Sequence, residues 1–405
     1  MSVAVVYVSM EVNDLDSIPA KNCNGCTACF NICPRNAITM VSDAEGFAYP
    51  VICEEACVNC GLCEAVCPEL HLPKLSDTYY GCYIAQSNRR EVLDTCTSGG
   101  FVDALNEHVI LKHEGYCVGV AYDEEFLPAH KIVNSCEEVK DFRNSKYAQS
   151  RLGSVFKELR AKLEEGKTVL FTGTPCQVAG LKSFLRKDYE NLFTVDLVCR
   201  SVPSPLMWKR YLSWQEERYK SKISSVTCRK KTYGYRSGAL EIQFENGRKY
   251  AGSNRVDYYM KSFHHDVCSR PSCYNCSFKT EHRCSDFTVF DCWQPHIVAE
   301  GLAFDNDKGY SNVLIHTEKG MRLLENLKDI TLYPADPAKM FTYTGEMERR
   351  SIIRTAERDT FYQDLRQLTF PDTDKKYVRV SNLDRLIERL KPARYMIQKV
   401  LRRNK

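Results

Sequence analysis

The cysteines in the first part of the chain repeat with a spacing that suits iron–sulfur chemistry. Residues 23–34 read CNGCTACFNICP and residues 57–68 read CVNCGLCEAVCP, so one pattern, C-x-x-C-x-x-C-x-x-x-C-P, recurs after 34 residues. Three closely spaced thiolates can hold one [4Fe–4S] cluster, and the fourth cysteine, before the proline, ligates the neighbouring cluster. The repeat therefore predicts a pair of [4Fe–4S] clusters.

The crossed ligation of such a pair assigns eight cysteines to two sites. One cluster is expected on Cys23, Cys26, Cys29 and Cys67, and the other on Cys57, Cys60, Cys63 and Cys33. Small residues between the ligands, such as Gly25 and Gly61, let backbone N–H groups approach the sulfurs. Zinc binding and plain packing are the alternatives, and the double repeat favours clusters over both. Cys53 lies outside the pattern and is expected to be a small buried apolar residue.

A second group of cysteines can be placed only through the elements around it. Residues 167–185, KTVLFTGTPCQVAGLKSFL, predict a short strand followed by an amphipathic helix, and residues 192–199, LFTVDLVC, predict another strand. The strands of such a βαβ unit are parallel, so Cys176 and Cys199 lie at the same carboxyl edge of a sheet, where such folds bind ligands. The C-x-x-C pair at 273–276 could complete a four-thiolate site there.

Other segments predict further elements. Apolar residues at helical spacing predict a helix that begins just after Gly100 and is capped by Thr97 or Ser98. The Gly-Gly start of this helix could seat a phosphate, although an ordinary capped helix is the favoured interpretation. Residues 239–251 alternate around an Asn-Gly turn and predict a β-hairpin, and residues 284–295 alternate like a strand.

The composition limits the class of protein. The chain has 405 residues, enough for two or three domains, and 21 cysteines, far more than packing alone requires in a reduced protein. Its first residues, MSVAVVYVSMEVND, show no basic segment or cleavage site, and no apolar run reaches membrane-spanning length. We therefore expect a cytoplasmic metal–thiolate protein rather than a disulfide scaffold.

Charge is distributed unevenly along the chain. Residues 1–80 hold ten acidic and three basic residues, a net charge of −7, which suits docking to a basic electron donor but also an ordinary solvated surface. Residues 375–405 hold eleven basic residues against Asp384 and Glu388, a net charge of +9. This amphipathic tail could pack on the domain, which is favoured, or bind an acidic partner or a membrane surface. No nucleic-acid-binding module is found, so no nucleic-acid partner is expected.

Through the cysteine motifs and several other stretches, the chain resembles the β-subunit family of coenzyme F420 hydrogenases and dehydrogenases, in the bacterial form with a fused N-terminal dicluster ferredoxin. The matching stretches are EGFAYP (45–50), TSGG (97–100), SKYAQS (145–150), VLFTGTPCQVAGL (169–181), DLVCRSVPSP (196–205), RPSCYNC (270–276) and SDFTVFDCW (285–293). The resemblance covers roughly residues 20–300. It implies a flavoprotein that binds FAD on the larger domain beside an iron–sulfur cluster.

The resemblance also carries individual residues over to this chain. The residues implied to contact FAD are Ser98, Gly99, Gly100, Lys146, Thr172, Gly173 and Thr174. A third [4Fe–4S] cluster is implied on Cys176, Cys199, Cys273 and Cys276, in agreement with the βαβ argument. Zinc on the same four thiolates, or structural thiols without a metal, are the alternatives, and Cys268 or Cys284 could replace one of the four.

Two stretches depart from the family pattern. Arg200 and Ser201 stand where the family usually has His-Gly, which changes the charge beside the proposed third cluster. Phe290 and Cys292 flank Asp291, where the family usually has a small residue before the acid and an aromatic residue after it. We expect Phe290 to narrow the space near a flavin.

Together these observations predict an α+β protein of three parts. They are a dicluster ferredoxin-like domain (1–75), a larger α/β flavin-binding domain (76–340) and a basic helical C-terminal region (341–405). The expected function is an oxidoreductase that relays single electrons from a ferredoxin-type donor or redox partner protein through [4Fe–4S] clusters to FAD and on to a small-molecule two-electron acceptor. The alternatives are an electron-transfer subunit without its own substrate and a flavin-free sensor. The sequence assigns no catalytic residue and does not name the acceptor.

Overall fold

The computed structural model describes residues 20–344 and 346–403, so the opening segment MSVAVVYVSMEVND lies outside the described residues. In the ferredoxin-like region, a hairpin of β1 (Ile38–Ser42) and β2 (Ala48–Ile52) joins the two cysteine motifs. Each motif leads into a short helix, α1 (Ala28–Ile32) or α2 (Leu62–Ala65), through a residue with left-handed backbone at the start. The motifs are therefore held as tight turns on a small sheet.

The larger domain is built on a mixed sheet. Its eight strands, in sheet order, are β13 (Ile330–Pro334), β3 (Gly81–Ser87), β12 (Ser311–Ile315), β11 (Phe287–Asp291), β7 (Leu192–Leu197), β6 (Val169–Gly173), β4 (Tyr116–Tyr122) and β5 (Pro128–Val133). The central four, β11, β7, β6 and β4, run parallel, and each outer strand is antiparallel to its neighbour. The parallel strands end at one edge, where ligand sites of α/β sheets form.

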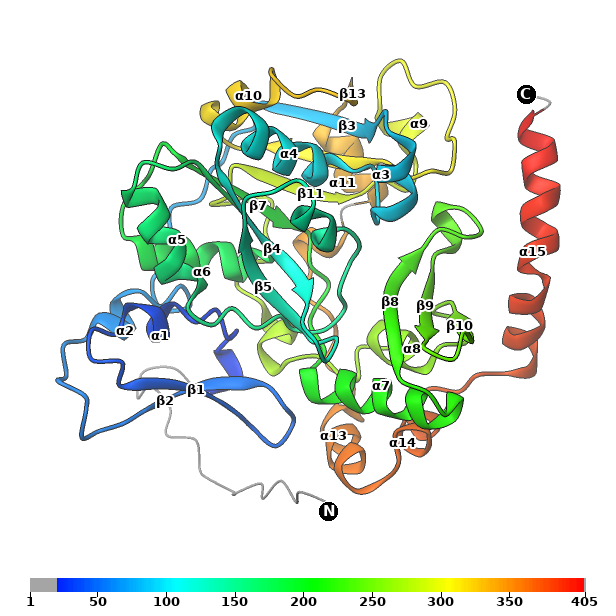
Figure 1. Ribbon diagram of the computed structural model, residues 1–405, viewed down its shortest axis with the longest axis horizontal. Helices are drawn as coiled ribbons and strands as arrows, with labels where there is room; N and C mark the ends of the chain where they lie inside the picture. Colours follow the sequence, from blue (N-terminus) through cyan, green and yellow to red (C-terminus); the bar gives the residue numbers. More distant parts are fainter. Residues whose placement is uncertain (1–19, 345, 404–405) are drawn as a thin grey trace.

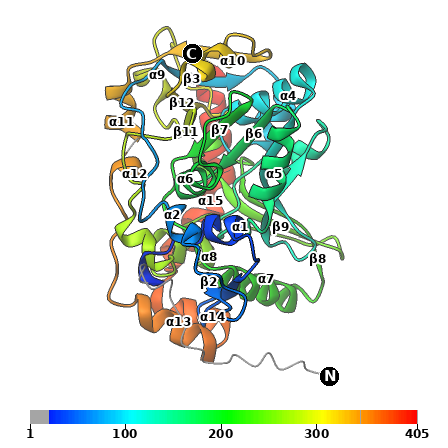
Figure 2. The ribbon, with the colours of Figure 1, turned by 90° about the vertical axis from the view of Figure 1, so that its left-hand side faces the viewer.

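Helices cover both faces of this sheet because its buried strands are apolar on both sides. On β6, Val169 and Phe171 pack with α5 (Val155–Glu164) and α6 (Pro175–Leu185). The intervening Leu170 points to the other face, into a core with α4 (Phe101–His113) and α10 (Glu318–Leu324). The ferredoxin-like region lies against the first of these layers, since α1 contacts both α5 and α6 (Figures 1 and 2).

A second lobe holds a three-stranded antiparallel sheet and an aromatic core. The sheet has the order β10 (Lys249–Gly252), β9 (Ala239–Phe244) and β8 (Ile223–Lys230), and the helices that pack into this lobe are α7 (Pro205–Tyr219), α8 (Tyr258–His264), α13 (Arg358–Gln367) and α14 (Phe370–Tyr377). Trp208 and Tyr259 meet edge to face at the centre, and Phe47 of the ferredoxin-like hairpin and Phe361 join them. Residues from all three predicted domains therefore share one core.

The remaining elements are short, except for the last helix. They are η1 (Ala20–Asn22), α3 (Arg90–Thr95), η2 (Glu138–Phe142), η3 (Tyr235–Ser237), η4 (Pro271–Asn275), α9 (Pro295–Val298), α11 (Pro337–Thr344), α12 (Glu346–Arg349) and α15 (Asn382–Arg403). Figure 1 shows α15 at the edge of the molecule, beside the three-stranded sheet. Among the described residues, no helix combines the length and apolar character needed to cross a bilayer.

The sequence predictions can be compared with these elements. The mixed α/β class is confirmed, as are the parallel βαβ unit β6–α6–β7, the hairpin β9–β10 and the strand β11. The helix after Gly100 is also confirmed, but the predicted cap is wrong because Gly100 itself is the N-cap. The hydroxyl of Thr97 instead accepts from the Ser145 backbone at 2.8 Å, and that of Ser98 donates to the Tyr310 carbonyl at 2.5 Å.

Candidate metal centres

The structure brings together the four cysteines predicted for the first cluster. Their side chains line one cavity at the base of the ferredoxin-like region: Cys23, Cys26, Cys29 and Cys67. Burial raises the pKa of Cys29, and the nearby charges of Cys23 and Cys67 raise it further. Thiols that burial and mutual repulsion keep protonated become thiolates when a metal supplies positive charge. The donor set therefore fits a cluster.

Two glycines allow the larger domain to approach this site closely. A Cβ atom on Gly180, in α6, would lie 2.9 Å from the Cys26 sulfur. One on Gly25 would lie 2.9 Å from the Gln149 side-chain nitrogen, and Gly25 also has a positive φ of 72°. Only glycine fits at either position without moving the cysteine loop. The first site is thus sealed by α6 and by the segment that carries Gln149.

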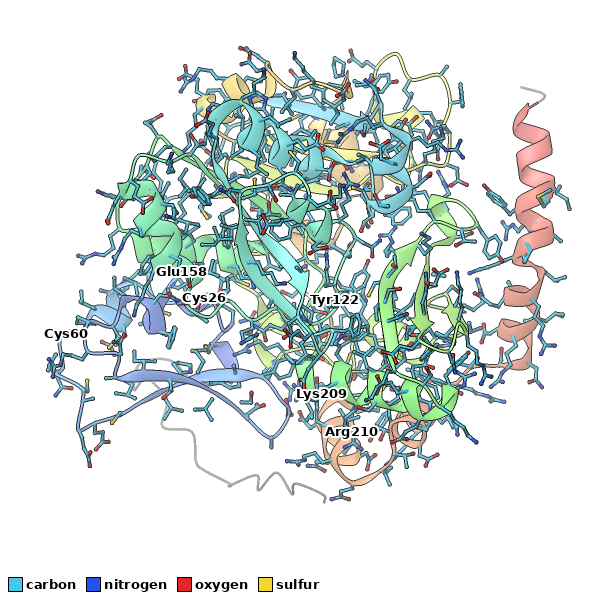
Figure 3. All side chains as sticks on the ribbon, in the orientation of Figure 1. Cys26, Cys60, Tyr122, Glu158, Lys209 and Arg210 are labelled. Atoms are coloured by element: carbon cyan, nitrogen blue, oxygen red, sulfur yellow. The ribbon has the colours of Figure 1, made fainter. Side chains whose placement is uncertain are left out.

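The second predicted site lies at the outer end of the ferredoxin-like region. Cys60 is exposed, whereas Cys33, Cys57 and Cys63 are partly buried. Figure 3 shows Cys60 at the outer edge of the molecule and Cys26 nearer to its body. Burial and then the charges of Glu64 and Cys60 raise the pKa of Cys63. Ligation by these four cysteines, like that by the four of the first site, stays a prediction.

Cys53, which was expected in the interior, is exposed, so that expectation is wrong. Its position after β2, in the turn Cys53–Cys57, explains the exposure, because this turn leaves the small sheet and passes over the surface. Cys53 lies outside both cysteine motifs but close to the second one in the chain, so its replacement is a control for the replacement of a ligand cysteine.

The third group of cysteines also meets in one cavity. Cys176 follows β6, Cys199 follows β7, and the C-x-x-C pair comes from η4; their thiols line the cavity together: Cys176, Cys199, Cys273 and Cys276. Burial raises the pKa of Cys176, and the charge of Cys276 adds to this effect. Burial raises the pKa of Cys199 to about 11, and the Lys279 cation limits that rise.

The two alternative ligands lie elsewhere. Cys268 is buried in the aromatic core of the second lobe, beside Tyr362. Cys284 packs at the edge of the α5–α6 core, and its pKa is raised to about 12 by burial and by the charge of Asp196. Neither lines the cavity of the third site. The geometry therefore favours Cys176, Cys199, Cys273 and Cys276 over either alternative.

No group of three or more His, Cys, Asp or Glu side chains in residues 20–344 and 346–403 has the geometry to hold a single metal ion. Four-iron clusters do not require such a geometry, because each cysteine ligates a different iron of the cube.

Two side chains join the first and third sites directly. The cavities of both sites are lined by Asn24 and Glu69. Glu69 accepts a hydrogen bond from Asn24 at 2.9 Å and another from Ser277, next to Cys276, at 2.7 Å. This carboxylate, which follows the Cys67-Pro68 pair, thus bridges the two cysteine loops.

Arg270 makes the second connection. It is fully buried, lines the third cavity, and donates to the Cys23 carbonyl at 2.8 Å and to the Ala48 carbonyl at 3.0 Å. Its guanidinium lies 4.3 Å from the Tyr49 ring centroid. Neither Arg270 nor Glu69 was expected from the sequence. The local signal that could have indicated them is their position, since Arg270 comes just before the C-x-x-C pair and Glu69 just after Cys67-Pro68.

The stretches that hold the predicted FAD residues lie next to one another in the larger domain. The hydroxyls of Thr97 and Ser145 are 3.0 Å apart, and Gln177 in α6 donates to Ser150 at 3.0 Å. These contacts bring the stretches TSGG, SKYAQS and VLFTGTPCQVAGL next to one another. The structure therefore gathers the segments implied by the resemblance, although they are well separated along the chain.

Several of these FAD candidates already have partners within the chain. The backbone N–H of Gly99 donates to Ser311 at 3.0 Å, and a Cβ atom on Gly99 would lie 2.1 Å from the Ala85 carbonyl oxygen. Lys146 donates to the carbonyls of Asp141 and Arg143 at 2.7 and 2.8 Å. Close packing on β3 thus explains Gly99 without a phosphate.

The turn after β6 offers a better fit to a ligand. The Thr172 hydroxyl is buried and has no hydrogen-bond partner among the described residues. Gly173 and Thr174 follow it at the carboxyl edge of the sheet, and Thr174 lines the third cavity. The Thr174 hydroxyl lies 3.1 Å from the Cys176 sulfur. A buried polar group that lacks a partner, two residues before Thr174 in the chain, suits a cofactor at this edge of the sheet.

The departures from the family pattern have local structural roles. Arg200 lines the third cavity and pairs with Asp266 through two hydrogen bonds of 2.9 and 2.7 Å. Phe290 packs in a core with Ile84 and Leu314, under α9 and α11. Arg200 is therefore neutralised by its own carboxylate.

The cysteine sites beside a mixed α/β sheet define the class of the protein: an iron–sulfur electron-transfer oxidoreductase. More particularly, residues 166–339 match the C terminus of the coenzyme F420 hydrogenase/dehydrogenase beta subunit, and residues 22–69 match a 4Fe-4S dicluster domain. The resemblance drawn from the sequence is thereby confirmed.

Two known proteins are similar to the chain. It is 24% identical over 348 residues to the coenzyme F420-dependent sulfite reductase of Methanocaldococcus jannaschii, and this match covers 81% of the chain but 50% of that protein. A chain of the F420-reducing [NiFe] hydrogenase complex of Methanosarcina barkeri, solved as a xenon derivative, is 19% identical with a TM-score of 0.45. That match covers 72% of this chain and 94% of the other.

Proposed function

We propose that the protein is an iron–sulfur flavoprotein that passes single electrons from a ferredoxin-type donor to a two-electron acceptor. Three [4Fe–4S] clusters, when bound, supply one-electron transfer, and FAD, when bound, supplies the exchange between single electrons and a hydride. The three cysteine sites would hold the clusters, and residues around the turn after β6 would hold the flavin. The name of the sulfite reductase relative makes coenzyme F420 the first acceptor to test.

The contact between the first and third cysteine sites carries this proposal. Glu69 and Arg270 each reach from one site to the other, and Asn24 lines both cavities. Such contact is not needed for two independent structural sites. It is what a path for electrons requires, because transfer between clusters depends on short separation through packed protein.

The exposed second site supports the proposed direction of the path. Cys60 is exposed, and so are Val58, at 57%, and the adjacent acids Glu54 and Glu55. An apolar side chain rimmed by charges is a common form of weak docking surface for redox partners. A donor that docks here faces the outermost cluster site, while the third site lies inside the larger domain.

The residues around the third site support a flavin beside it. Thr172 presents a buried hydroxyl without a partner among the described residues, and Thr174 lies between that hydroxyl and Cys176 in the chain. A buried hydroxyl that lacks a partner can donate a hydrogen bond to a cofactor.

The experiment that tests the proposal follows electrons through the protein under anaerobic conditions. A reduced ferredoxin is mixed with the protein, bleaching of the flavin absorbance is recorded, and coenzyme F420 is then added. We expect flavin bleaching in the wild type. In the variant C273S/C276S we expect the dicluster absorbance to bleach while the flavin stays oxidised, because the third site is lost.

The variant C53S serves as the matched control, since it removes an exposed cysteine that lies outside both motifs. It should behave like the wild type. Flavin bleaching at an unchanged rate in C273S/C276S, with FAD still bound, would contradict the relay. A wild-type protein that binds no flavin would favour the flavin-free sensor instead.

A second function has one observation in its favour. Half of the sulfite reductase relative lies outside its match to this chain. Chemistry on the acceptor could therefore be done by a partner, with the present chain acting as its electron-transfer subunit. Reduction of F420 or of a dye only after a partner protein is added would support this alternative.

A further inference from the structure

The last long helix is attached to the molecule by its polar side. In α15, Glu388 accepts from the Ser253 backbone at 3.1 Å and from the Ser253 hydroxyl at 2.7 Å. Asp384 lies 3.5 Å from the Lys261 amine and 3.6 Å from the Arg255 guanidinium. Further along, the Tyr395 and Tyr233 rings meet edge to face. The acids of the helix are thus turned inward and neutralised.

The apolar side of the same helix faces solvent. The side chains Leu383, Leu386, Leu390 and Ile397 are 63%, 53%, 54% and 61% exposed. Their spacing of three, four and seven residues places them on one face of a helix. A helix that merely packs on its own domain buries such a stripe, so α15 has the reverse orientation. The sequence-based expectation that this segment packs on the domain by its apolar face is therefore wrong.

Positive charge surrounds this exposed stripe. Arg385, Arg389 and Arg394 are exposed on α15, and none of the three guanidinium groups forms an ion pair within residues 20–344 and 346–403. A second copy of α15 on the stripe would bring these like charges together, which disfavours self-association. An anionic membrane surface has an apolar acyl layer that can bury the leucine stripe and negative headgroups that can pair with the arginines.

We propose that α15 is an interfacial helix by which this redox protein binds an anionic membrane surface. The helix of 22 residues lies in the plane of the headgroups, with its leucines in the acyl boundary and its arginines at the phosphates. The polar contacts of Asp384 and Glu388 hold the body of the protein on the water side. This inference goes beyond the proposed electron relay and does not depend on it.

Vesicle sedimentation with the full-length protein tests the proposal. The protein is mixed with vesicles of phosphatidylcholine alone, or of phosphatidylcholine with phosphatidylglycerol, at low and high salt. We expect binding to the anionic vesicles only, weakened by salt. R385Q/R389Q/R394Q should weaken binding roughly a hundredfold, because each cation near an anionic surface contributes about fivefold.

L386S/L390S/I397S should abolish binding, because the leucine stripe is lost. L111S is its matched control. Leu111 is a leucine 66% exposed on α4, and its replacement should leave binding unchanged. Unchanged iron content in every variant shows that the fold is intact. The proposal is overturned if the wild type ignores anionic vesicles, if the α15 variants bind like the wild type, or if the leucine variant changes only the oligomeric state.

Discussion

At the scale of single residues, charged groups connect the first and third cysteine sites. Arg270 is the clearest case, because its side chain is fully buried and joins the first cysteine loop to the start of η4. The C-x-x-C motif beside it could be recognised from sequence. The contact between Arg270 and Cys23 could not be predicted, because the two residues are 247 positions apart and no local sequence pattern indicates it.

Replacement of Arg270 should lower the reduction potential of the first cluster. A buried cation near the Cys23 sulfur, 3.9 Å from a guanidinium nitrogen, stabilises the more negative reduced state. We expect Arg270→Met to make that potential more negative by an amount on the order of tens of millivolts. Arg270→Lys keeps the positive charge and should keep the potential close to that of the wild type. A redox titration followed by electron paramagnetic resonance measures the shift. Equal potentials in Met and Lys variants with full iron content would contradict the role.

Asp374, in α14, should make stability depend on pH. Burial raises its pKa from 3.8 to about 8, the Ser262 hydroxyl donates to it at 2.7 Å, and its other oxygen has no partner among the described residues. The folded state therefore keeps a proton that the unfolded chain loses above about pH 4. Stability from this group is full at low pH and is lost as the pH rises toward 8.

Asp374→Asn should flatten that dependence, by a few kcal/mol across the window between about pH 4 and pH 8. Unfolding temperatures measured anaerobically at several pH values give the slope. The control is Asp372→Asn, an exposed acid on the same helix whose pKa is lowered by its hydrogen bond from Thr369. A slope that is the same in Asp374→Asn and the wild type would show that the carboxyl is not protonated when folded.

At the scale of elements, much of the fold could be predicted because its signals are local. The apolar run Val169, Leu170 and Phe171, the breaks at Gly173 and Pro175 and the helical spacing after them are enough to define β6 and α6. This topology placed Cys176 and Cys199 at one edge of the sheet, because parallel strands end at one edge. The C-x-x-C pair was added to them as a possible completion of a four-thiolate site. The cap of α4 was predicted wrongly because the Thr97 hydroxyl accepts a hydrogen bond from the Ser145 backbone, 48 residues away, instead of capping the helix.

The packing of α6 on the cysteine loop gives a prediction at this scale. Gly180→Ala would place a methyl group 2.9 Å from the Cys26 sulfur and 2.7 Å from its Cβ atom. The helix or the loop must then move, and we expect loss of most of the iron of the first site, about four atoms per chain. Iron analysis after anaerobic purification measures this loss.

Ser183→Ala on the same helix is the matched control, since it adds no atoms beside the cysteine loop. It should retain all the iron. Full iron content and an unchanged spectrum in Gly180→Ala would show that the contact between α6 and the first site does not matter for cluster binding.

At the scale of the whole molecule, the three groups of cysteines are arranged in order from the surface inward. The second site is exposed, the first is sealed by α6, and the third lies at η4 and the edge of the main sheet. Figure 3 shows Cys60 of the second site farther out than Cys26 of the first. The aromatic core explains why the parts stay together, since Phe47, Trp208 and Phe361 come from all three predicted domains. Sequence could not predict this shared core, because aromatic residues carry no record of their distant partners.

The most direct test of this arrangement is to quantify iron, acid-labile sulfide, zinc and FAD in the anaerobically purified protein and in C273S/C276S. The account predicts about twelve irons and one FAD per chain in the wild type, and about eight irons in the variant. About eight irons with one zinc in the wild type would contradict it, because the third site would then be structural and the path to the flavin would end at the dicluster region.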